Sequence, residues 1–220
     1  LALSGAKVVA VEIDRSLLPV LAEQLEGLDV KIVEADVLKV NLDDLAAGHG
    51  LRKPYKIVAN LPYYITTPII MDILESNYDY ERIVIMVQWE VARRLTAQPG
   101  SKEFGSVTLA VQYYTEAEIL FKVPRQAFNP MPEVDSAVIA LQKREKPPVD
   151  VSDPQLLFKL IKASFGQRRK TLLNALVAAE RGLNKTAVQD RLNRAGLDGQ
   201  RRGETLSLEE YARLVNVWYS

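Results

Sequence analysis

The sequence predicts an α/β protein in which a parallel sheet is followed by a purely helical C-terminal segment. Short apolar runs typical of buried strands alternate with segments that carry leucines at helical spacing, as far as residue 142. Consecutive prolines at positions 147 and 148 then interrupt the pattern, and only helical spacing follows them. Alternating strands and helices favour a parallel sheet with right-handed crossovers, so a sheet domain and a smaller helical domain are expected.

The chain opens with an expected βαβ unit. Residues 7–13 and 30–34 read as short buried strands, and residues 16–25 between them read as a helix because leucines recur there at helical spacing. These leucines are Leu17, Leu18, Leu21 and Leu25. Further strands are expected over 55–59, 82–87, 119–123 and 136–142, the last two as an antiparallel pair at the sheet edge. Further helices are expected over 67–75, 90–97 and 106–114, the first with Pro68 near its start.

A linker over 146–150 divides the chain into two expected domains, residues 1–151 and 152–220, because consecutive prolines fit neither a strand nor a helix interior. The second domain is expected to hold helices over 154–165, 169–180, 186–195 and 207–217. Asn184 or Thr186 would begin the third helix. Ser207, with Glu210 three residues later, forms a capping box for the last.

Composition narrows the possible classes of protein. The 220 residues include 48% hydrophobic and 25% charged residues, as in a soluble globular protein. The absence of cysteine excludes disulfides and thiolate metal sites and fits a reducing compartment, so a cytoplasmic protein without a metal is expected. No apolar run is long enough to span a bilayer. The single His49 lies in a glycine-containing stretch and reads as a surface loop residue.

The net charge of zero hides an asymmetry between the two expected domains. Residues 1–151 hold 16 Lys and Arg against 21 Asp and Glu, whereas residues 152–220 hold 12 against 7. A basic small domain beside an acidic larger one is typical of a module that binds phosphates, although a solvated helical surface would give the same count.

The tetrapeptide Asn60-Leu61-Pro62-Tyr63 follows the strand expected over 55–59, at the edge where open α/β sheets place their chemistry. Pro62 fixes its own φ and biases Leu61 toward an extended backbone, which would present the Leu61 carbonyl beside the Asn60 amide oxygen. Tyr63 adds an aromatic face. The segment therefore suits a flat ring that bears an amine, although a simple proline-containing turn is the plainer interpretation.

Several segments of the sequence, in the same order, resemble the small-subunit ribosomal RNA adenine dimethyltransferases, the KsgA family. The tetrapeptide and the residues after it match the family's adenine-methylating motif, and Val11-Glu12-Ile13-Asp14 and Ala35-Asp36-Val37-Leu38 match its ribose-binding and adenine-binding segments. The other matching segments are Gln88 with Glu90-Val91-Ala92, Ser101-Lys102-Glu103-Phe104-Gly105, residues 128–138 and residues 165–174. The resemblance covers nearly the whole chain and implies a Rossmann-like, S-adenosylmethionine-dependent methyltransferase sheet.

The resemblance implies dimethylation of two adjacent adenines in small-subunit rRNA within an immature ribosomal subunit. Glu12 would accept the ribose hydroxyls of S-adenosylmethionine, Asp36 would accept from its adenine amine, and Ile13 or Val37 would pack on the ring. Glu12, Asp36 and Asn60 are then expected in one row along the carboxyl edge of the sheet, with Asn60 between cofactor and substrate.

Aromatic and basic residues complete the expected site. Tyr63 and Phe128 would stack on the extruded target base, since the family uses the matching aromatic of Phe128 in that role. Two basic runs would contact rRNA phosphates, and a monomer is expected. These are Arg168, Arg169 and Lys170, and Arg201 with Arg202.

The sequence departs from the family at two places. The family begins with a helical arm and a first strand that ends in a glycine-rich loop, whereas here Leu1 stands shortly before the first expected strand, so an incomplete cofactor site is expected. Trp89 stands where the family usually has lysine, which indicates packing or stacking in place of a charged contact.

Three other functions remain possible at this point. A large-subunit rRNA methyltransferase of the antibiotic-resistance type shares the catalytic layout, but the basic helical segment favours the small-subunit family. DNA adenine methyltransferases more usually carry Asp-Pro-Pro-Tyr in place of the tetrapeptide. A non-catalytic RNA-binding assembly factor is the third possibility, which the N-terminal departure favours and the presence of Glu12, Asp36 and Asn60 disfavours.

Overall fold

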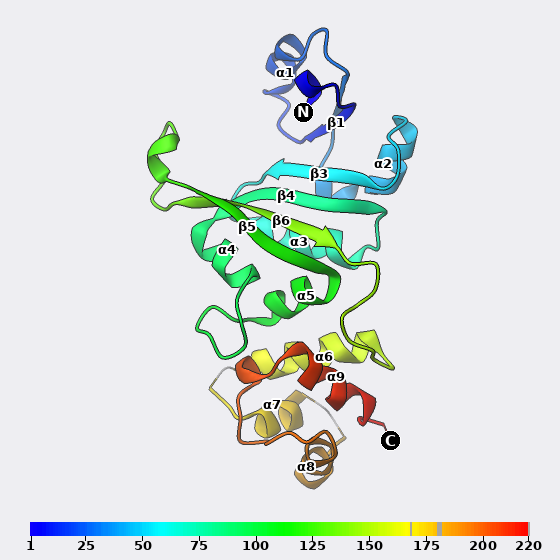
Figure 1. Ribbon diagram of the computed structural model, residues 1–220, viewed down its shortest axis with the longest axis vertical. Helices are drawn as coiled ribbons and strands as arrows, with labels where there is room; N and C mark the ends of the chain where they lie inside the picture. The colour runs from blue at the N-terminus through cyan, green and yellow to red at the C-terminus, as the bar shows by residue number, and fades with distance from the viewer. Residues whose placement is uncertain (168, 180–181, 220) are drawn as a thin grey trace. The chain divides into compact units, whose positions relative to one another are not determined.

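The computed structural model describes residues 1–167, 169–179 and 182–219. The chain forms two compact units, residues 1–84 and 85–220, and the long strand β4 (Tyr80–Gln88) runs across the division. Among these residues no helix is long and apolar enough to cross a membrane. Figure 1 shows the order of the elements along the chain.

The first unit begins with the expected βαβ motif. Strand β1 (Val8–Glu12) pairs in parallel with β2 (Val30–Glu34), residue for residue from Val8 opposite Val30 to Glu12 opposite Glu34, and helix α1 (Leu18–Gln24) connects them. The unit continues through α2 (Leu42–Gly48), β3 (Tyr55–Asn60) and α3 (Thr66–Glu75). In-register parallel pairing brings the carboxyl ends of β1 and β2 to the same edge.

Helix α2 was not expected from the sequence. Asn41 caps it, since its side-chain oxygen accepts a hydrogen bond from the Asp44 N–H at 3.0 Å, and two acidic residues occupy its first turn. The helix is seven residues long and buries one side chain, Ala46, so it lacks the apolar spacing by which the other helices were recognised.

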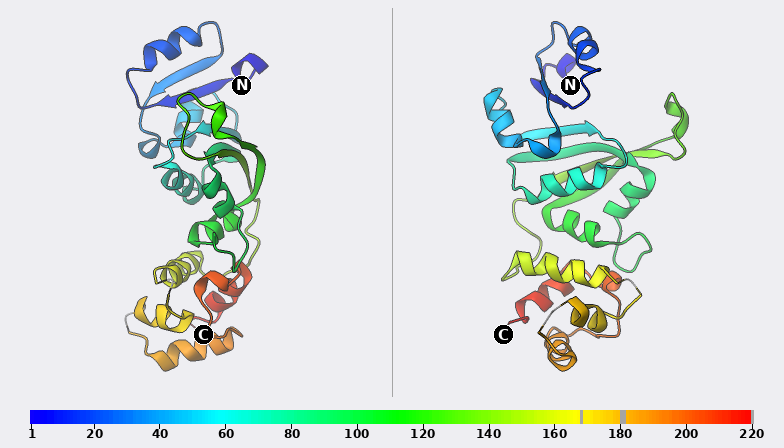
Figure 2. Two further views of the ribbon diagram at one scale, coloured as in Figure 1. Left: turned by 90° about the vertical axis from the view of Figure 1, so that its left-hand side faces the viewer. Right: turned by 180° about the vertical axis from the view of Figure 1, so that it is seen from behind.

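The second unit places an antiparallel pair of strands against helices. Strands β5 (Thr115–Val123) and β6 (Ser136–Lys143) pair antiparallel, as expected, with an irregularity between Ile119 and Phe121. Helices α4 (Trp89–Leu95) and α5 (Ser106–Tyr114) pack on one face of this pair, which the front and back views both show (Figures 1 and 2). The four-stranded sheet has the order β3-β4-β6-β5.

Four helices follow residue 150 and gather into one cluster (Figure 2): α6 (Pro154–Phe165), α7 (Leu172–Ala179), α8 (Lys185–Arg194) and α9 (Leu208–Asn216). Asn184 caps α8, and Ser207 and Glu210 form the expected capping box of α9. The cluster shares a hydrophobic core with α5 and with the loop that precedes α5. Phe104 and Leu109 belong to the same buried group as Leu157 and Trp218. The boundary at 151 therefore stays a prediction, because the apolar core continues across it.

Candidate active site

The end of β1 holds Glu12 in a fixed turn. One carboxylate oxygen of Glu12 accepts the Asp14 N–H at 2.8 Å, and the other makes no hydrogen bond with the described residues. Asp14 in turn accepts from the Ser16 hydroxyl at 2.6 Å and from the Ser16 N–H at 2.8 Å, and these bonds lower the pKa of Asp14. Glu12 thus presents a free acceptor at the strand end, and Ile13 beside it is 64% exposed.

The end of β2 lies beside Glu12. The Ala35 N–H donates to the Glu12 carbonyl at 3.0 Å, so the two strand ends are tied together. Asp36 caps a short 3-10 turn by accepting the Leu38 N–H at 3.1 Å, and its other oxygen lies 3.3 Å from Lys39 Nζ. Val37 is half-buried in that turn. The structure brings Glu12 and Asp36 to one edge, with Asp36 already partly engaged.

The tetrapeptide begins at the last residue of β3. Asn60 is exposed, and neither its side-chain amide nor the Leu61 carbonyl makes a hydrogen bond with the described residues. The Pro62 carbonyl accepts from the Ile65 N–H at 3.1 Å and from the Thr66 hydroxyl at 3.0 Å, which fixes the loop against the start of α3. Tyr63 is half-buried, so part of its ring is accessible. The Asn60 amide oxygen and the Leu61 carbonyl are therefore two unpaired acceptors on a loop that hydrogen bonds hold in place.

The expected single row of Glu12, Asp36 and Asn60 along one sheet is not observed. Strands β1 and β2 form a two-stranded sheet of their own, whereas β3 belongs to the four-stranded sheet. No strand among the described residues joins these two sheets. The apolar pattern predicts that a segment is a strand but does not fix its neighbours.

Phe128 lies in the second unit, on the loop between β5 and β6. It is half-buried with an extended backbone, directly after a 3-10 turn over Arg125–Ala127. Asp135 anchors this loop: its carboxylate accepts the Arg125 N–H at 2.9 Å and pairs with Lys122 at 2.7 Å, while its carbonyl accepts the Trp89 N–H at 2.9 Å. The bond from Lys122, with that from Arg125, lowers the pKa of Asp135.

Sequence reasoning missed this anchor. Asp135 was part of a matched motif but received no role, because its partners lie on β5 and α4, which only the fold brings together. The one signal in the sequence was an acidic residue directly before the strand expected over 136–142.

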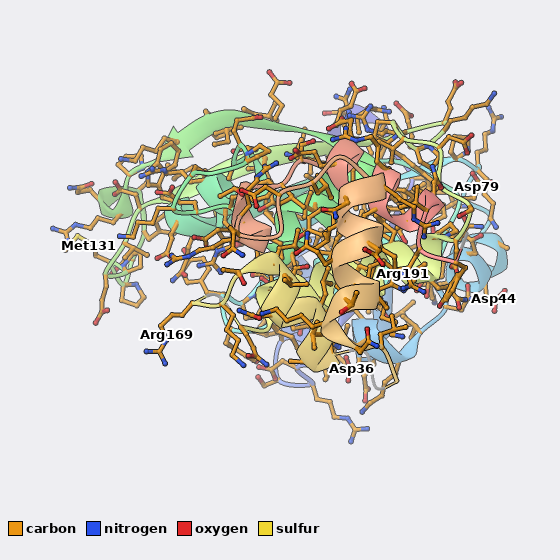
Figure 3. The ribbon with its side chains drawn as sticks, turned by 90° about the horizontal axis from the view of Figure 1, so that it is seen from below. Asp36, Asp44, Asp79, Met131, Arg169 and Arg191 are labelled. Atoms are coloured by element: carbon orange, nitrogen blue, oxygen red, sulfur yellow. The ribbon has the colours of Figure 1, made fainter. Side chains whose placement is uncertain are left out.

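The basic residues of the C-terminal segment differ in their surroundings. Arg168 lies outside the described residues. Arg169 and Lys170 are exposed without an ion pair to the described residues, and Figure 3 shows Arg169 extending away from the ribbon. Arg202 is exposed in the same way.

Arg201 differs, because it is engaged inside the helical cluster. Its guanidinium binds both carboxylate oxygens of Glu210, which raises the pKa of Arg201 and lowers that of Glu210, and it donates to the Thr205 carbonyl at 2.6 Å. Three exposed cations therefore remain for phosphates among the described members of the two basic runs. No group of three or more His, Cys, Asp or Glu side chains in the described part of the chain could hold a metal ion.

Comparison with known proteins places these features in a family. The profile described as "Ribosomal RNA adenine dimethylase" matches residues 2–217. A "Ribosomal RNA small subunit methyltransferase A" of Clostridioides difficile is 50% identical over 212 residues, which cover 96% of this chain and 73% of the relative. The protein of the same name from Geobacillus thermodenitrificans is 50% identical over 221 residues, covering 99% and 75% respectively.

Solved structures confirm the Rossmann-like methyltransferase fold. A dimethyladenosine transferase from Plasmodium falciparum has a TM-score of 0.74 at 22% identity and covers 94% of this chain and 80% of that one. The 23S rRNA methyltransferase ErmE has a TM-score of 0.69 at 25% identity, with 97% of this chain and 82% of that one covered.

Proposed function

Because this chain belongs to the ribosomal RNA adenine dimethylase family, we propose that it dimethylates the exocyclic amines of two adjacent adenines in small-subunit rRNA. The observation that carries the proposal is the pair of unpaired acceptors at the end of β3, the Asn60 amide and the Leu61 carbonyl. The rRNA of an immature ribosomal subunit in the cytoplasm is the proposed substrate, and a monomer the proposed active form.

The two acceptors suit an adenine amine, which has two hydrogens to donate. Binding both hydrogens favours a more tetrahedral nitrogen whose lone pair is released from the ring and can attack a methyl group. Catalysis is then mainly positioning and electrostatic stabilisation. The site needs no strong base, because the proton on the methylated, positively charged nitrogen is very acidic.

S-adenosylmethionine, which supplies an electrophilic methyl group, fits the residues at the ends of β1 and β2. The free oxygen of Glu12 suits ribose hydroxyls, and the exposed Ile13 offers an apolar surface to the adenine ring. Asp36 and Val37 are the proposed contacts at the second strand end, where Lys39 competes for one oxygen of Asp36. In this proposal these residues bind and orient the cofactor, and Asn60 holds the adenine amine.

The remaining roles are assigned from accessibility. Tyr63 and Phe128, each half-buried, are proposed to stack on the extruded base. Arg169, Lys170 and Arg202 are proposed to bind rRNA phosphates, with Arg168 as a further candidate outside the described residues. The strong pairing with Glu210 makes Arg201 the weakest of the five proposed phosphate contacts. The large-subunit alternative is not favoured, since ErmE is 25% identical and the small-subunit relatives about 50%.

Substitution of Asn60 tests the proposal. Asn60→Ala should abolish methyl transfer with little loss of RNA affinity. The Asn60 amide aligns the adenine amine, whereas the exposed cations of the two basic runs are proposed to supply most of the RNA binding. Asn60→Asp keeps an acceptor oxygen and should retain part of the turnover. Asn193→Ala, on an exposed face of α8, is the matched control and should behave as the parent.

Methyl transfer is measured on immature small subunits, and RNA affinity by titration. Because this chain spans about three quarters of its relatives' length, the assay is run on this chain and on a full-length relative that carries the matching substitution. Near-normal turnover of Asn60→Ala would refute the proposed role of the amide.

A further inference from the structure

A pocket of about 360 Å³ lies in the second unit, where β4 ends and α4 begins. Its lining residues come from that junction and from the loop between β5 and β6. They are Gln88, Trp89, Glu90, Arg125, Glu133, Val134 and Asp135. The volume is in the range of pockets that hold small ligands. None of the residues assigned above to cofactor, target base or phosphate lines it.

Trp89 provides a fixed aromatic surface in this pocket. Its side chain is half-buried, and Lys122 Nζ lies 5.1 Å from the centroid of its ring. Lys122 is itself held by Asp135, whose carbonyl also accepts the Trp89 N–H. Lys122 holds the ring and the hydrogen bond to Asp135 holds the main chain of Trp89, so a planar ligand could stack on the ring with little further loss of side-chain freedom.

The polar side chains of the pocket suit the edge of a nucleobase. Glu133 and Gln88 make no hydrogen bond through their side chains with the described residues. A carboxylate accepts only, whereas an amide both donates and accepts. Glu133 therefore matches the exocyclic amine that adenine, cytosine and guanine carry and uracil lacks.

The charges around the pocket argue against a phosphate. Asp135 is neutralised by Lys122 at 2.7 Å, and Glu90 by Arg94 at 2.8 Å. The Arg125 guanidinium donates to the Glu133 carbonyl at 3.4 Å, and in the sum of charges around the pocket the Glu133 carboxylate offsets its positive charge. A nearly neutral site with an aromatic wall favours a base over the RNA backbone.

We propose that this pocket binds one unstacked, amine-bearing nucleobase of the RNA strand, stacked on Trp89 and contacted by Glu133. The inference rests on the proposed function in that RNA is the substrate. Phe128 lies between Arg125 and Asp135 in the chain, so the loop that forms one wall of the pocket also carries the proposed stacking partner of the reacting base. The pocket therefore holds a flanking nucleotide.

Tryptophan fluorescence offers a direct test on the 220-residue chain. The chain has two tryptophans, and Trp218 is 1% exposed, so Trp89 is the fluorophore that a bound base can reach. Single-stranded RNA hexamers of adenosine or cytidine should quench the emission saturably, and the uridine hexamer more weakly. Trp89→Phe should lose the quenching, while Trp218→Phe should keep it.

Affinity measurements on variants complete the test. Loss of one base-stacking contact lowers affinity by about 5- to 150-fold, so Trp89→Ala should bind the adenosine hexamer more weakly within that range, and Trp89→Phe should fall between. Glu133→Gln should reduce the preference for adenosine and cytidine over uridine. Thermal unfolding identifies any variant that fails to fold, and the conservative Trp89→Phe and Glu133→Gln then carry the test.

Absence of quenching, or quenching that persists in Trp89→Phe, would overturn the inference and leave Trp89 as a packing residue. Equal affinity of the parent and Trp89→Ala for the adenosine hexamer would do the same. The outcome is separable from the proposed function. Methyl transfer that depends on Asn60 without quenching through Trp89 contradicts the pocket alone, whereas quenching without methyl transfer contradicts the enzyme alone.

Discussion

The β1–α1–β2 segment, residues 8–34, and the second unit differ in how they are held together. None of the residues in β1, α1 or β2 is buried. The second unit contains one continuous hydrophobic cluster that extends from Ala97 to Trp218 and includes fully buried leucines on α5, α6 and α9. Glu12, Ile13 and Asp36, the proposed cofactor residues, therefore lie on or beside the part of the chain with the least buried apolar surface. If these residues bind the cofactor as proposed, the free energy of cofactor binding and the free energy of folding come mainly from different regions.

Matched leucine substitutions should show this difference at its largest. Leu157→Ala, in α6, removes a side chain with no exposure and should cost about 2–5 kcal/mol of unfolding free energy through the lost transfer energy and the cavity. Leu21→Ala, in α1, removes a half-buried side chain and should cost less, about 1 kcal/mol.

Urea unfolding followed by Trp218 emission, in chains that also carry Trp89→Phe, reports the first change, and hydrogen exchange of the α1 amides reports the second. Leu21→Ala should leave exchange in α6 unchanged, because the two segments belong to different units. Similar losses in the two variants would contradict the contrast between the segments.

Glu12→Ala should weaken the binding of S-adenosylmethionine by about 1.5–3 kcal/mol, the range for hydrogen bonds to a charged group. Glu12→Gln keeps one acceptor oxygen and should lose less. Calorimetry on this chain and on a full-length relative with the matching substitutions measures both. Because a ligand stabilises the state that binds it, saturation should also slow hydrogen exchange in β1 and β2, and Glu12→Ala should reduce that protection. Unchanged affinity would place the nucleoside elsewhere.

Local patterns in the sequence were enough to predict most elements of the fold. Leucines at helical spacing identified α1, and the Ser207 and Glu210 capping box identified the start of α9. Strand neighbours could not be predicted in this way, because apolar alternation is a property of one segment and pairing is a property of two. The expected row of three strand ends failed for that reason.

The candidate site shows the same limit. The Asn60 loop was predictable because its residues are adjacent in sequence. The roles of Asp135 and Arg201 were not, since Lys122, Trp89 and Glu210 reach them only through the fold. A count of charges treats Arg201 and Arg169 alike, whereas the structure engages one and exposes the other.

The last prediction separates these two kinds of arginine. Arg201→Ala should cost about 1–2 kcal/mol of unfolding free energy, since the pair with Glu210 is mostly but not fully shielded from water. Arg201 lowers the pKa of Glu210 below its ordinary value of 4.5, so the pair stabilises the fold above that pH and loses its effect as the pH falls through the lowered pKa. The difference between parent and variant should therefore be largest near neutral pH and shrink in acid.

Replacing Arg169 and Lys170 together with alanine should give the opposite result. Both side chains are exposed, so unfolding free energy should change by no more than about 0.5 kcal/mol. Each phosphate contact contributes about 0.7 to 0.9 to the log-log dependence of RNA affinity on salt, so the slope should fall by up to about 1.4 to 1.8. The affinity of the parent, of Arg201→Ala and of the double variant for one rRNA fragment is measured over a range of salt concentrations, and the three slopes are compared. Identical slopes for the parent and the double variant would make Arg169 and Lys170 ordinary solvated residues, whereas a flattened slope in Arg201→Ala, measured where that variant is folded, would show that Glu210 releases Arg201 to the RNA.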